Sequence, residues 1–542
     1  MMNDEYRVGI IWWKVLFFSL LAGYCFYYAP YGINETDGGF LTGLAWQVLN
    51  GKVLYGDVIY VRPPLPVWLR AAELTLLPEP WAVLGERWLF YGKVALYAWF
   101  GASLLCAGTR RWVLATLGFV VSAHCYPAAA WHTVDGILCS VLGFWLLFRG
   151  TQIKSTGYVI LAAAAIFAST LCKQSFYPLA LLFIGLLIYL GDRRMAGWGI
   201  GFFLFCNVLF FSFLQWQGVL GNYLNLTGGA ASGGQAFQHG MLDYFRIQPL
   251  LLALSFLLLL LVWGLLKNVA RVIHFGKAIS TVWALWIAIL LGSYAYAIWR
   301  NQDFTAPFAQ ARLLFDLSAI FGIMALKKRF WTLDQGLRFV ALMAVSWCAS
   351  VSWGYNLPIL FAVPWVFTTM EMSRLLNFSD SKKLKNIARA TALVALLLVF
   401  RYGYEFIYRD GQRSQMTENM EQVFPQLRGI YSDTATFALY RDLKELSARY
   451  GPNFKTLPSF PQASYLCQAY PPLPLDWVVE REINSDHTLI TSALQTKKPV
   501  LFLEKRFREQ MQNDPELRLT LELFQQGKLI GETPHFWVLV DY

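Results

Sequence analysis

The stretch that decides how this chain is interpreted begins Asn34-Glu-Thr-Asp37-Gly-Gly-Phe40 and continues to Arg62-Pro63-Pro64. It follows the first apolar segment but is too polar to lie inside a bilayer. Its apolar side chains recur at helical spacing, at Phe40, Leu41, Leu44, Ala45, Val48 and Leu49. The spacing predicts an amphipathic helix at the membrane interface, with a rigid proline-rich turn behind it. Asp37 lies at the start of this helix, where a helix N-terminus favours a carboxylate.

The composition indicates a membrane protein that crosses the bilayer many times. Of 542 residues, 56% are hydrophobic and 15% are charged, whereas soluble proteins are about 25% charged. The first apolar run ends in Tyr27-Tyr28-Ala29-Pro30, which is not a small-residue cleavage site, so we expect it to stay as an anchor. The eight cysteines contain no CxxC pair and indicate neither a zinc site nor a disulfide framework.

Apolar segments long enough to cross a membrane predict about thirteen spans. They fall near 9–29, 88–107, 112–130, 134–148, 157–172, 176–190, 197–216, 249–267, 279–299, 307–326, 337–353, 356–372 and 387–405.

Lysine and arginine are concentrated in alternate loops, which predicts the orientation. A cytoplasmic N-terminus places the basic loops inside, at Arg110-Arg111, Arg149/Lys154, Arg193-Arg194, Lys267/Arg271/Lys277, Lys327-Lys328-Arg329 and Lys382-Lys383-Lys385. This pattern accounts for the net charge of +11 without a nucleic-acid partner. The loop 31–87 and the C-terminus are then extracytoplasmic, most simply at a bacterial inner membrane.

The predicted fold is an all-α membrane bundle with extracytoplasmic interfacial helices and a small C-terminal α/β domain. Residues 1–409 form the transmembrane part in this interpretation, and 410–542 form the soluble extracytoplasmic domain. The soluble part shows a helix pattern at 434–450 that ends at Gly451. Strand-like runs follow at 455–457, 500–503 and 537–540.

Ionisable residues gather at the outer face of this topology, and such residues near a membrane are candidates for function. They are Asp37, Arg62, His132, Asp135, Lys173, Arg300 and Asp303, with Tyr355 in a tight turn between two spans. Carboxylates beside cations on one aqueous side suggest an active site for an anionic substrate.

Each candidate also has a structural interpretation. Asp37 is a candidate general base, although an N-cap is as good an explanation. Lys173 suits a phosphate at the headgroup level, although snorkelling lysines are common. Asp135 could be a second carboxylate that holds a donor hydroxyl, a metal or the neighbouring cation, or it could be an N-cap. His132 could be an interfacial histidine. Arg62 could brace its proline turn, and Arg300 could simply be solvated.

The order of these motifs resembles the GT-C superfamily of integral membrane glycosyltransferases. The likeness is to the branch that holds protein O-mannosyltransferases and the lipid A aminoarabinose transferase. It is carried by Asp37-Gly-Gly-Phe40, Gly51-Lys-Val-Leu-Tyr55-Gly-Asp57, Arg62-Pro63-Pro64, Val134-Asp135-Gly136 and Thr170-Leu-Cys-Lys173-Gln174. It covers about residues 10–190. Many relatives have Asp-Glu where this chain has Asp37-Gly38.

The resemblance implies an inverting transferase that moves a sugar from a polyprenyl-phosphate carrier to an acceptor hydroxyl on the outer face. Asp37 would be the catalytic base. Lys173, Arg300 or Arg62 would hold the phosphate, with Asp135, His132 and Tyr355 nearby. The acceptor could be a glycan, a lipid or a protein, and membrane lipids would surround the enzyme. No cofactor is implied with certainty, and a divalent metal stays open.

Two other functions fit the same sequence. A transporter or flippase for a lipid-linked or polar solute would use intramembrane acids, for which Asp316 and Glu371 are the candidates. A catalytically inactive scaffold of the same fold is the third, because the acid after Asp37 is missing.

Overall fold

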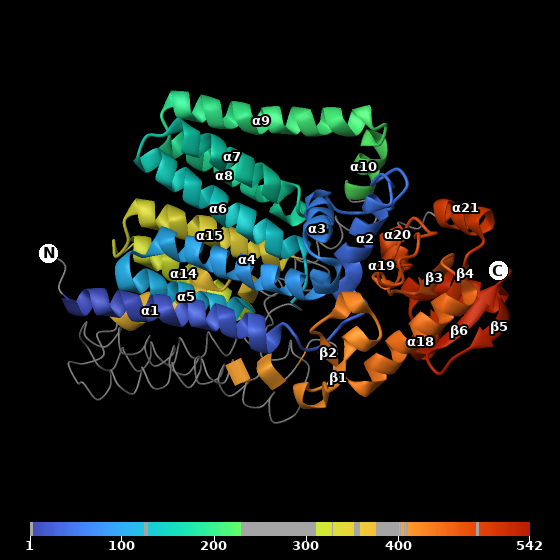
Figure 1. The fold of residues 1–542 in the computed structure, drawn as a ribbon. Helices are drawn as coiled ribbons and strands as arrows, with labels where there is room; N and C mark the ends of the chain where they lie inside the picture. The colour runs from blue at the N-terminus through green and yellow to red at the C-terminus, as the bar shows by residue number, and fades with distance from the viewer. Residues whose placement is uncertain are drawn as a thin grey trace, which may run out of the picture.

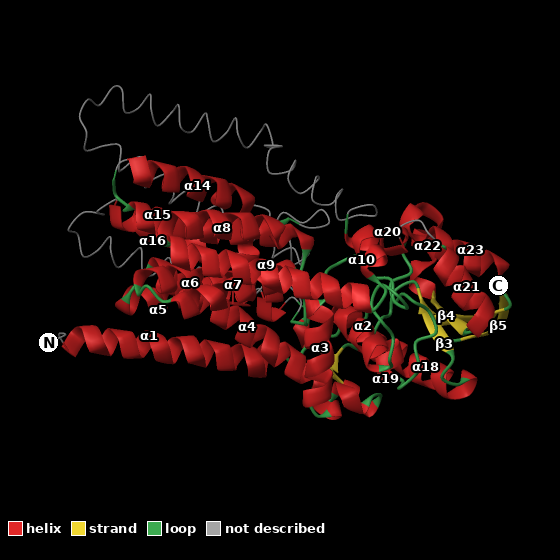
Figure 2. Cartoon of the chain, turned by 90° about the horizontal axis from the view of Figure 1, so that it is seen from above, coloured by secondary structure: helices red, strands yellow, loops and turns green. Residues whose placement is uncertain are grey.

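The protein's three-dimensional structure is a computed structural model that describes residues 4–123, 128–228, 311–327, 329–351, 358–375, 410–483 and 487–542, with short pieces at 400–401, 403–405 and 407. Long helices lie side by side and form one bundle (Figures 1 and 2). Its members are α1 (Asp4–Gly23), α4 (Ala82–Leu105), α5 (Gly108–Ala123), α6 (His132–Gln152), α7 (Thr156–Thr170), α8 (Tyr177–Leu190), α9 (Arg193–Trp216), α14 (Ala311–Lys327), α15 (Leu333–Ser350) and α16 (Val363–Leu375).

Three of the described helices are long and apolar enough to cross a membrane. They are Gly9–Tyr28, His132–Gln152 and Arg193–Trp216, and they match the predicted spans 9–29, 134–148 and 197–216. The count of thirteen spans is not confirmed. The predicted spans at 249–267 and 279–299, and most of 387–405, lie outside the described residues.

The first loop forms the predicted helix, α2 (Phe40–Leu49), and most of its side chains are buried within the protein. Its buried residues are Phe40, Leu41, Thr42, Gly43, Leu44, Ala45 and Gln47. Its position at the membrane interface stays a prediction. The following helix, α3 (Leu65–Leu76), begins at the proline-rich segment with Pro66 in its first turn, where a missing N–H does no harm.

The C-terminal part covers α2, and this explains its burial. At Gly43 an added Cβ would lie 2.5 Å from the carbonyl oxygen of Pro461, so only glycine permits this approach. The Gln47 amide donates to Asp476 at 2.8 Å, and Lys455 pairs with the same carboxylate at 2.8 Å. The polar side of α2 thus faces buried polar groups from a distant segment instead of water.

The C-terminal part contains the small α/β unit that the sequence predicts. Its sheet has the order β3-β4-β6-β5, with β3 (Phe454–Leu457) parallel to β4 (Val500–Glu504). Strand β6 (Phe536–Val540) is antiparallel to both β4 and β5 (Lys528–Glu532). The predicted helix is α18 (Thr434–Tyr450), and it ends at Gly451, whose φ of +82° favours glycine. Within this sheet, β5 is the strand that had no counterpart in the sequence prediction.

A buried arginine fixes the start of the first loop. Arg87, near the beginning of α4, donates from Nη1 to the carbonyl of Ala29 and from Nη2 to the carbonyl of Gly32, both at 2.6 Å. The next backbone N–H, that of Ile33, donates to the Asp410 carboxylate at 2.7 Å. The backbone just before the Asp37 motif is therefore held on one side by Arg87 of the bundle and on the other by Asp410 of the C-terminal part.

Replacing Arg87 with Met should lower the free energy of unfolding by about 2–5 kcal/mol, because two buried carbonyls lose their donor. Thermal unfolding in detergent, followed by tryptophan fluorescence, would measure this. Arg441→Gln is the control, since Arg441 is exposed and pairs only with Glu445 at 3.9 Å; it should change stability by less than about 0.5 kcal/mol. Equal melting curves for the two variants would contradict this role of Arg87.

Candidate active site

Asp37 lies in a turn that a neighbouring side chain organises. The Asn34 side-chain oxygen accepts the backbone N–H groups of Thr36 at 3.2 Å and of Asp37 at 2.7 Å. Asp37 is the first residue of the short helix Asp37–Gly39, and Thr36 and Gly39 are the N-cap residues of this helix and of α2. Neither of these two residues makes a capping hydrogen bond with its side chain, and the local turn uses Asn34. The Asp37 side chain is mostly buried, with 8% of the residue exposed.

Arg62 lies against the start of the same helix. Its guanidinium donates two hydrogen bonds to the Glu482 carboxylate, at 3.0 and 2.7 Å, and lies 5.2 Å from the centre of the Phe40 ring. Burial lowers the pKa of Arg62, but the charges of Glu482, Tyr60 and Asp37 outweigh it, and the pKa is raised. Arg62 is thus a fixed cation within electrostatic range of Asp37. Its predicted contact with phosphate stays a prediction.

Lys173, which belongs to the helical bundle, lies within electrostatic range of Arg62. It lies between α7 and α8, 6% exposed, and its Nζ donates to the carbonyl of Val351 at 3.1 Å. No described carboxylate pairs with it. Burial first, and then the positive charge of Arg62, lower the pKa of Lys173 to about 7. A buried ammonium beside a second cation is a place where an anion would be stabilised.

The segments that carry these two cations are tied together. The Gln174 amide donates to the carbonyl of Val61 at 2.6 Å, and the N–H of Leu65 donates to the carbonyl of Leu171 at 3.0 Å. At Gly136, in α6, an added Cβ would come within 2.3 Å of the Phe176 ring. Glycine at that position therefore lets the segment after Lys173 pack directly against α6.

Several buried polar atoms around these residues have no hydrogen-bond partner among the residues that the structure describes. They are Tyr60 Oη, His132 Nδ1, Thr133 Oγ1, Ser175 Oγ and Trp477 Nε1. Three of these residues are linked to Phe40 by aromatic contacts. The ring centres of Trp477 and Tyr60 lie 4.5 and 6.4 Å from that of Phe40. The His132 ring stacks on Trp131, which in turn contacts Phe40. Unsatisfied buried polar groups are uncommon in native proteins and are often explained by a bound polar molecule or water.

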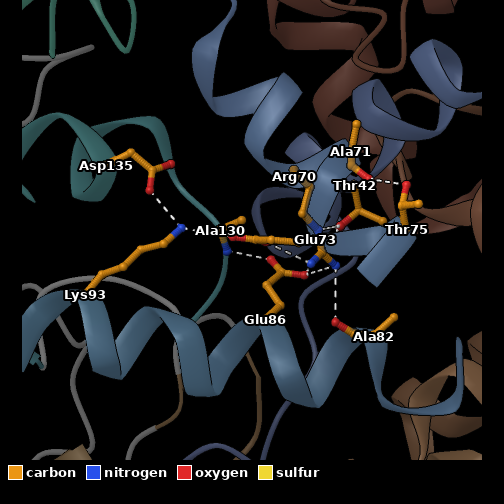
Figure 3. A network of polar contacts seen from close by, with 10 residues as sticks. All are labelled: Thr42, Arg70, Ala71, Glu73, Thr75, Ala82, Glu86, Lys93, Ala130 and Asp135. Atoms are coloured by element: carbon orange, nitrogen blue, oxygen red, sulfur yellow. Dashed lines mark hydrogen bonds and ion pairs between the residues drawn. The ribbon is translucent and has the colours of Figure 1, made fainter. Parts of the chain in front are cut away.

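Asp135 belongs to a different cluster. Its carboxylate pairs with Lys93 at 2.8 Å, and Lys93 pairs with Glu73 at 3.0 Å (Figure 3). Arg70 continues the network to Glu73 at 3.2 Å and to Glu86. Of the roles expected for Asp135, the structure shows the partnership with a cation. The network joins α3, α4 and α6.

The remaining predicted residues cannot be placed. Arg300, Asp303 and Tyr355 lie outside the described residues, and their roles stay predictions.

Glu371, on which the transporter alternative depends, pairs with Arg110. Among the residues that the structure describes, no group of three or more His, Cys, Asp or Glu side chains could hold a metal ion.

Sequence reasoning missed the acidic partners that come from the C-terminal part. Glu482 is 420 residues from Arg62, and no local pattern distinguishes it from other glutamates. Arg506 contacts Glu35, two residues before Asp37, and also Glu504 at 2.8 Å. Only the prediction of an extracytoplasmic C-terminal domain indicated that this part could reach the loop.

No protein-family model and no curated protein matches the sequence. Solved structures do match. The archaeal oligosaccharyltransferase AglB from Archaeoglobus fulgidus, in complex with an inhibitory peptide and a dolichol-phosphate, has a TM-score of 0.46 and 10% identity, over 98% of this chain and 74% of that one.

ArnT from Cupriavidus metallidurans in the apo state has a TM-score of 0.43 and 12% identity, over 98% of both chains. Bound to undecaprenyl phosphate, ArnT has a TM-score of 0.39 and 13% identity, again over 98% of both. At these TM-scores, the chemistry has to be argued from the residues of this chain.

The lowered pKa of Lys173 predicts how its charge affects stability. Between pH 7 and the ordinary lysine value of 10.5, the unfolded chain binds a proton that the folded chain does not. Stability should therefore rise with pH in this window, by up to about 1.4 kcal/mol per unit. In Lys173→Met this contribution disappears, so the free energy of unfolding of the wild type should rise relative to that of the variant as pH rises from 7 to 10. Parallel stability curves would contradict the assignment.

Proposed function

We propose that this protein is an inverting glycosyltransferase that moves a sugar from a polyprenyl-phosphate carrier to an acceptor hydroxyl at the outer face of the membrane. The observation that carries the proposal is Lys173, a buried cation with no described carboxylate partner, placed beside Arg62 and close to the segment that holds Asp37. The ordered GT-C-like motifs fall on these same residues.

Lys173 would hold the carrier phosphate. It follows the apolar helix α7 and precedes the apolar helix α8, so a lipid phosphate could reach it while the chain of the lipid stays among apolar side chains. The Arg62 charge is neutralised by Glu482, which leaves the Lys173 charge available to an anion. A fixed ammonium in a site of low polarity stabilises the phosphate that develops negative charge as the sugar leaves.

Asp37 would be the base. Its carboxylate takes the proton from the acceptor hydroxyl, and the resulting oxygen forms a bond to the anomeric carbon of the sugar. The bond from that carbon to the phosphate oxygen breaks, and its electron pair leaves with the polyprenyl phosphate. Attack opposite the leaving group inverts the anomeric configuration. The unsatisfied Tyr60, Ser175 and His132 atoms are available to hydroxyl groups of the sugar.

The rest of the proposal follows the sequence interpretation. The acceptor is a glycan, a lipid or a protein of the cell envelope, and the membrane is the bacterial inner membrane. Residues 1–409 form the catalytic membrane part, and 410–542 support the first loop from outside. Glu482 and the buried pair of Lys455 and Asp476 support this role for the C-terminal part.

Asp37→Asn should reduce transfer by about 10²–10⁴-fold, because the amide cannot accept the proton. The assay is release of undecaprenyl phosphate from undecaprenyl-phosphate-linked glucose, mannose and aminoarabinose, with a cell-envelope extract as acceptor. Asp57→Asn is the matched control, since Asp57 is an exposed carboxylate of the same loop that accepts from the N–H of Val53 at 2.9 Å. Equal rates for the two variants would exclude Asp37 as the base.

Lys173→Ala should weaken binding of undecaprenyl phosphate by about tenfold or more, because a charge-assisted contact is lost. Native mass spectrometry in detergent would compare it with Lys528→Ala, an exposed lysine of β5. Wild-type binding should also weaken as pH rises above 7, where Lys173 loses its proton in the free protein. A pH-independent adduct that persists in Lys173→Ala would contradict the proposed phosphate site.

A further inference from the structure

A basic cavity lies at the opposite end of the bundle from Lys173. It has a volume of about 420 Å³ and is lined by three arginines and three amphipathic aromatic residues: Arg111, Arg149, Arg338, Trp99, Trp145 and Tyr158. His132 and Arg149 lie near opposite ends of the 21-residue helix α6, which separates the cavity from the candidate active site by about 25 Å.

The arginines are held in place but keep hydrogen-bonding capacity. The Arg111 guanidinium lies 5.5 Å from the Trp99 ring, and that of Arg338 lies 5.1 Å from the Phe148 ring. Arg338 also donates from Nη1 to the carbonyl of Leu104 at 3.3 Å and pairs with Asp334. Arg111 Nε, Arg338 Nη2 and Trp99 Nε1 are buried and have no hydrogen-bond partner in the structure.

The charge of the cavity is strongly one-sided. None of its lining residues is acidic, and Asp334 is the one described carboxylate that pairs with a lining arginine. Two or three guanidinium groups around unsatisfied N–H donors match the oxygens of a phosphate, which accept several hydrogen bonds at once. Tryptophan and tyrosine beside them are typical of the level of lipid headgroups.

We propose that this cavity binds the phosphate of an anionic lipid headgroup. The predicted topology places Arg111 and Arg149 on the cytoplasmic side, where basic pockets between membrane helices attract anionic lipids. The site is separate from the proposed donor site, and it does not depend on the transferase proposal. A bound headgroup would join α5, α6 and α15 through their arginines and should therefore stabilise the bundle.

Native mass spectrometry of the full chain in detergent would test this with phosphatidylglycerol, phosphatidylcholine and inorganic phosphate as probes. The double variant R111Q/R149Q should bind phosphatidylglycerol about tenfold more weakly than wild type. Arg193→Gln, an exposed arginine at the start of α9, is the control and should bind as wild type does. Phosphatidylglycerol, but not phosphatidylcholine, should raise the melting temperature of the wild type.

Three results would overturn the proposal: equal phosphatidylglycerol binding by R111Q/R149Q and Arg193→Gln, equal stabilisation by phosphatidylcholine, or full displacement of phosphatidylglycerol by millimolar inorganic phosphate. The last result would assign the cavity to a soluble phosphate compound. The single variant Arg149→Gln separates loss of binding from loss of folding, because Arg149 is exposed and its replacement should not disturb the fold. Its lipid-free melting temperature should equal that of the wild type while its phosphatidylglycerol binding falls, and unchanged binding would count against the site.

Discussion

The two hydrogen bonds between the Arg62 guanidinium and the Glu482 carboxylate join the first loop to a segment 420 residues further along the chain. Both side chains are almost fully buried. Removing either partner would leave a charge in a site of low polarity, which typically costs about 3–5 kcal/mol. The loop and the C-terminal part are therefore coupled, since each contains the group that the other needs.

The charge of Arg62 also reaches Lys173. Glu482 neutralises Arg62. Burial first, and then the charge of Arg62, lower the pKa of Lys173, and no described carboxylate pairs with it. The free protein thus holds a lysine that is costly to keep protonated. An anion bound beside it would remove this cost, which is the physical basis of the proposed phosphate site.

The network of Glu73, Glu86 and Lys93 has a different role. It connects α3 and α4, and through Asp135 it reaches α6 (Figure 3). These contacts tie α3 and α4 to the first turn of α6, which begins at His132. The acids Glu73, Glu86 and Asp135 thus pair with cations between helices, whereas Glu482 comes from the C-terminal part and pairs with Arg62. Spacing along the chain does not show this division.

The sequence by itself determined what depends on local pattern. Apolar length indicated the membrane helices at 9–29, 134–148 and 197–216, helical spacing indicated the helix after Asp37, and Gly451 marked the end of α18. Only the tertiary structure decided that α2 is buried, that Asp135 pairs with Lys93, and that Glu482 meets Arg62. Hydrogen-bonded helices and turns form between near neighbours, so their signals stay in the local sequence. Ion pairs across hundreds of residues depend on which surfaces the fold brings together, and no local pattern records that choice.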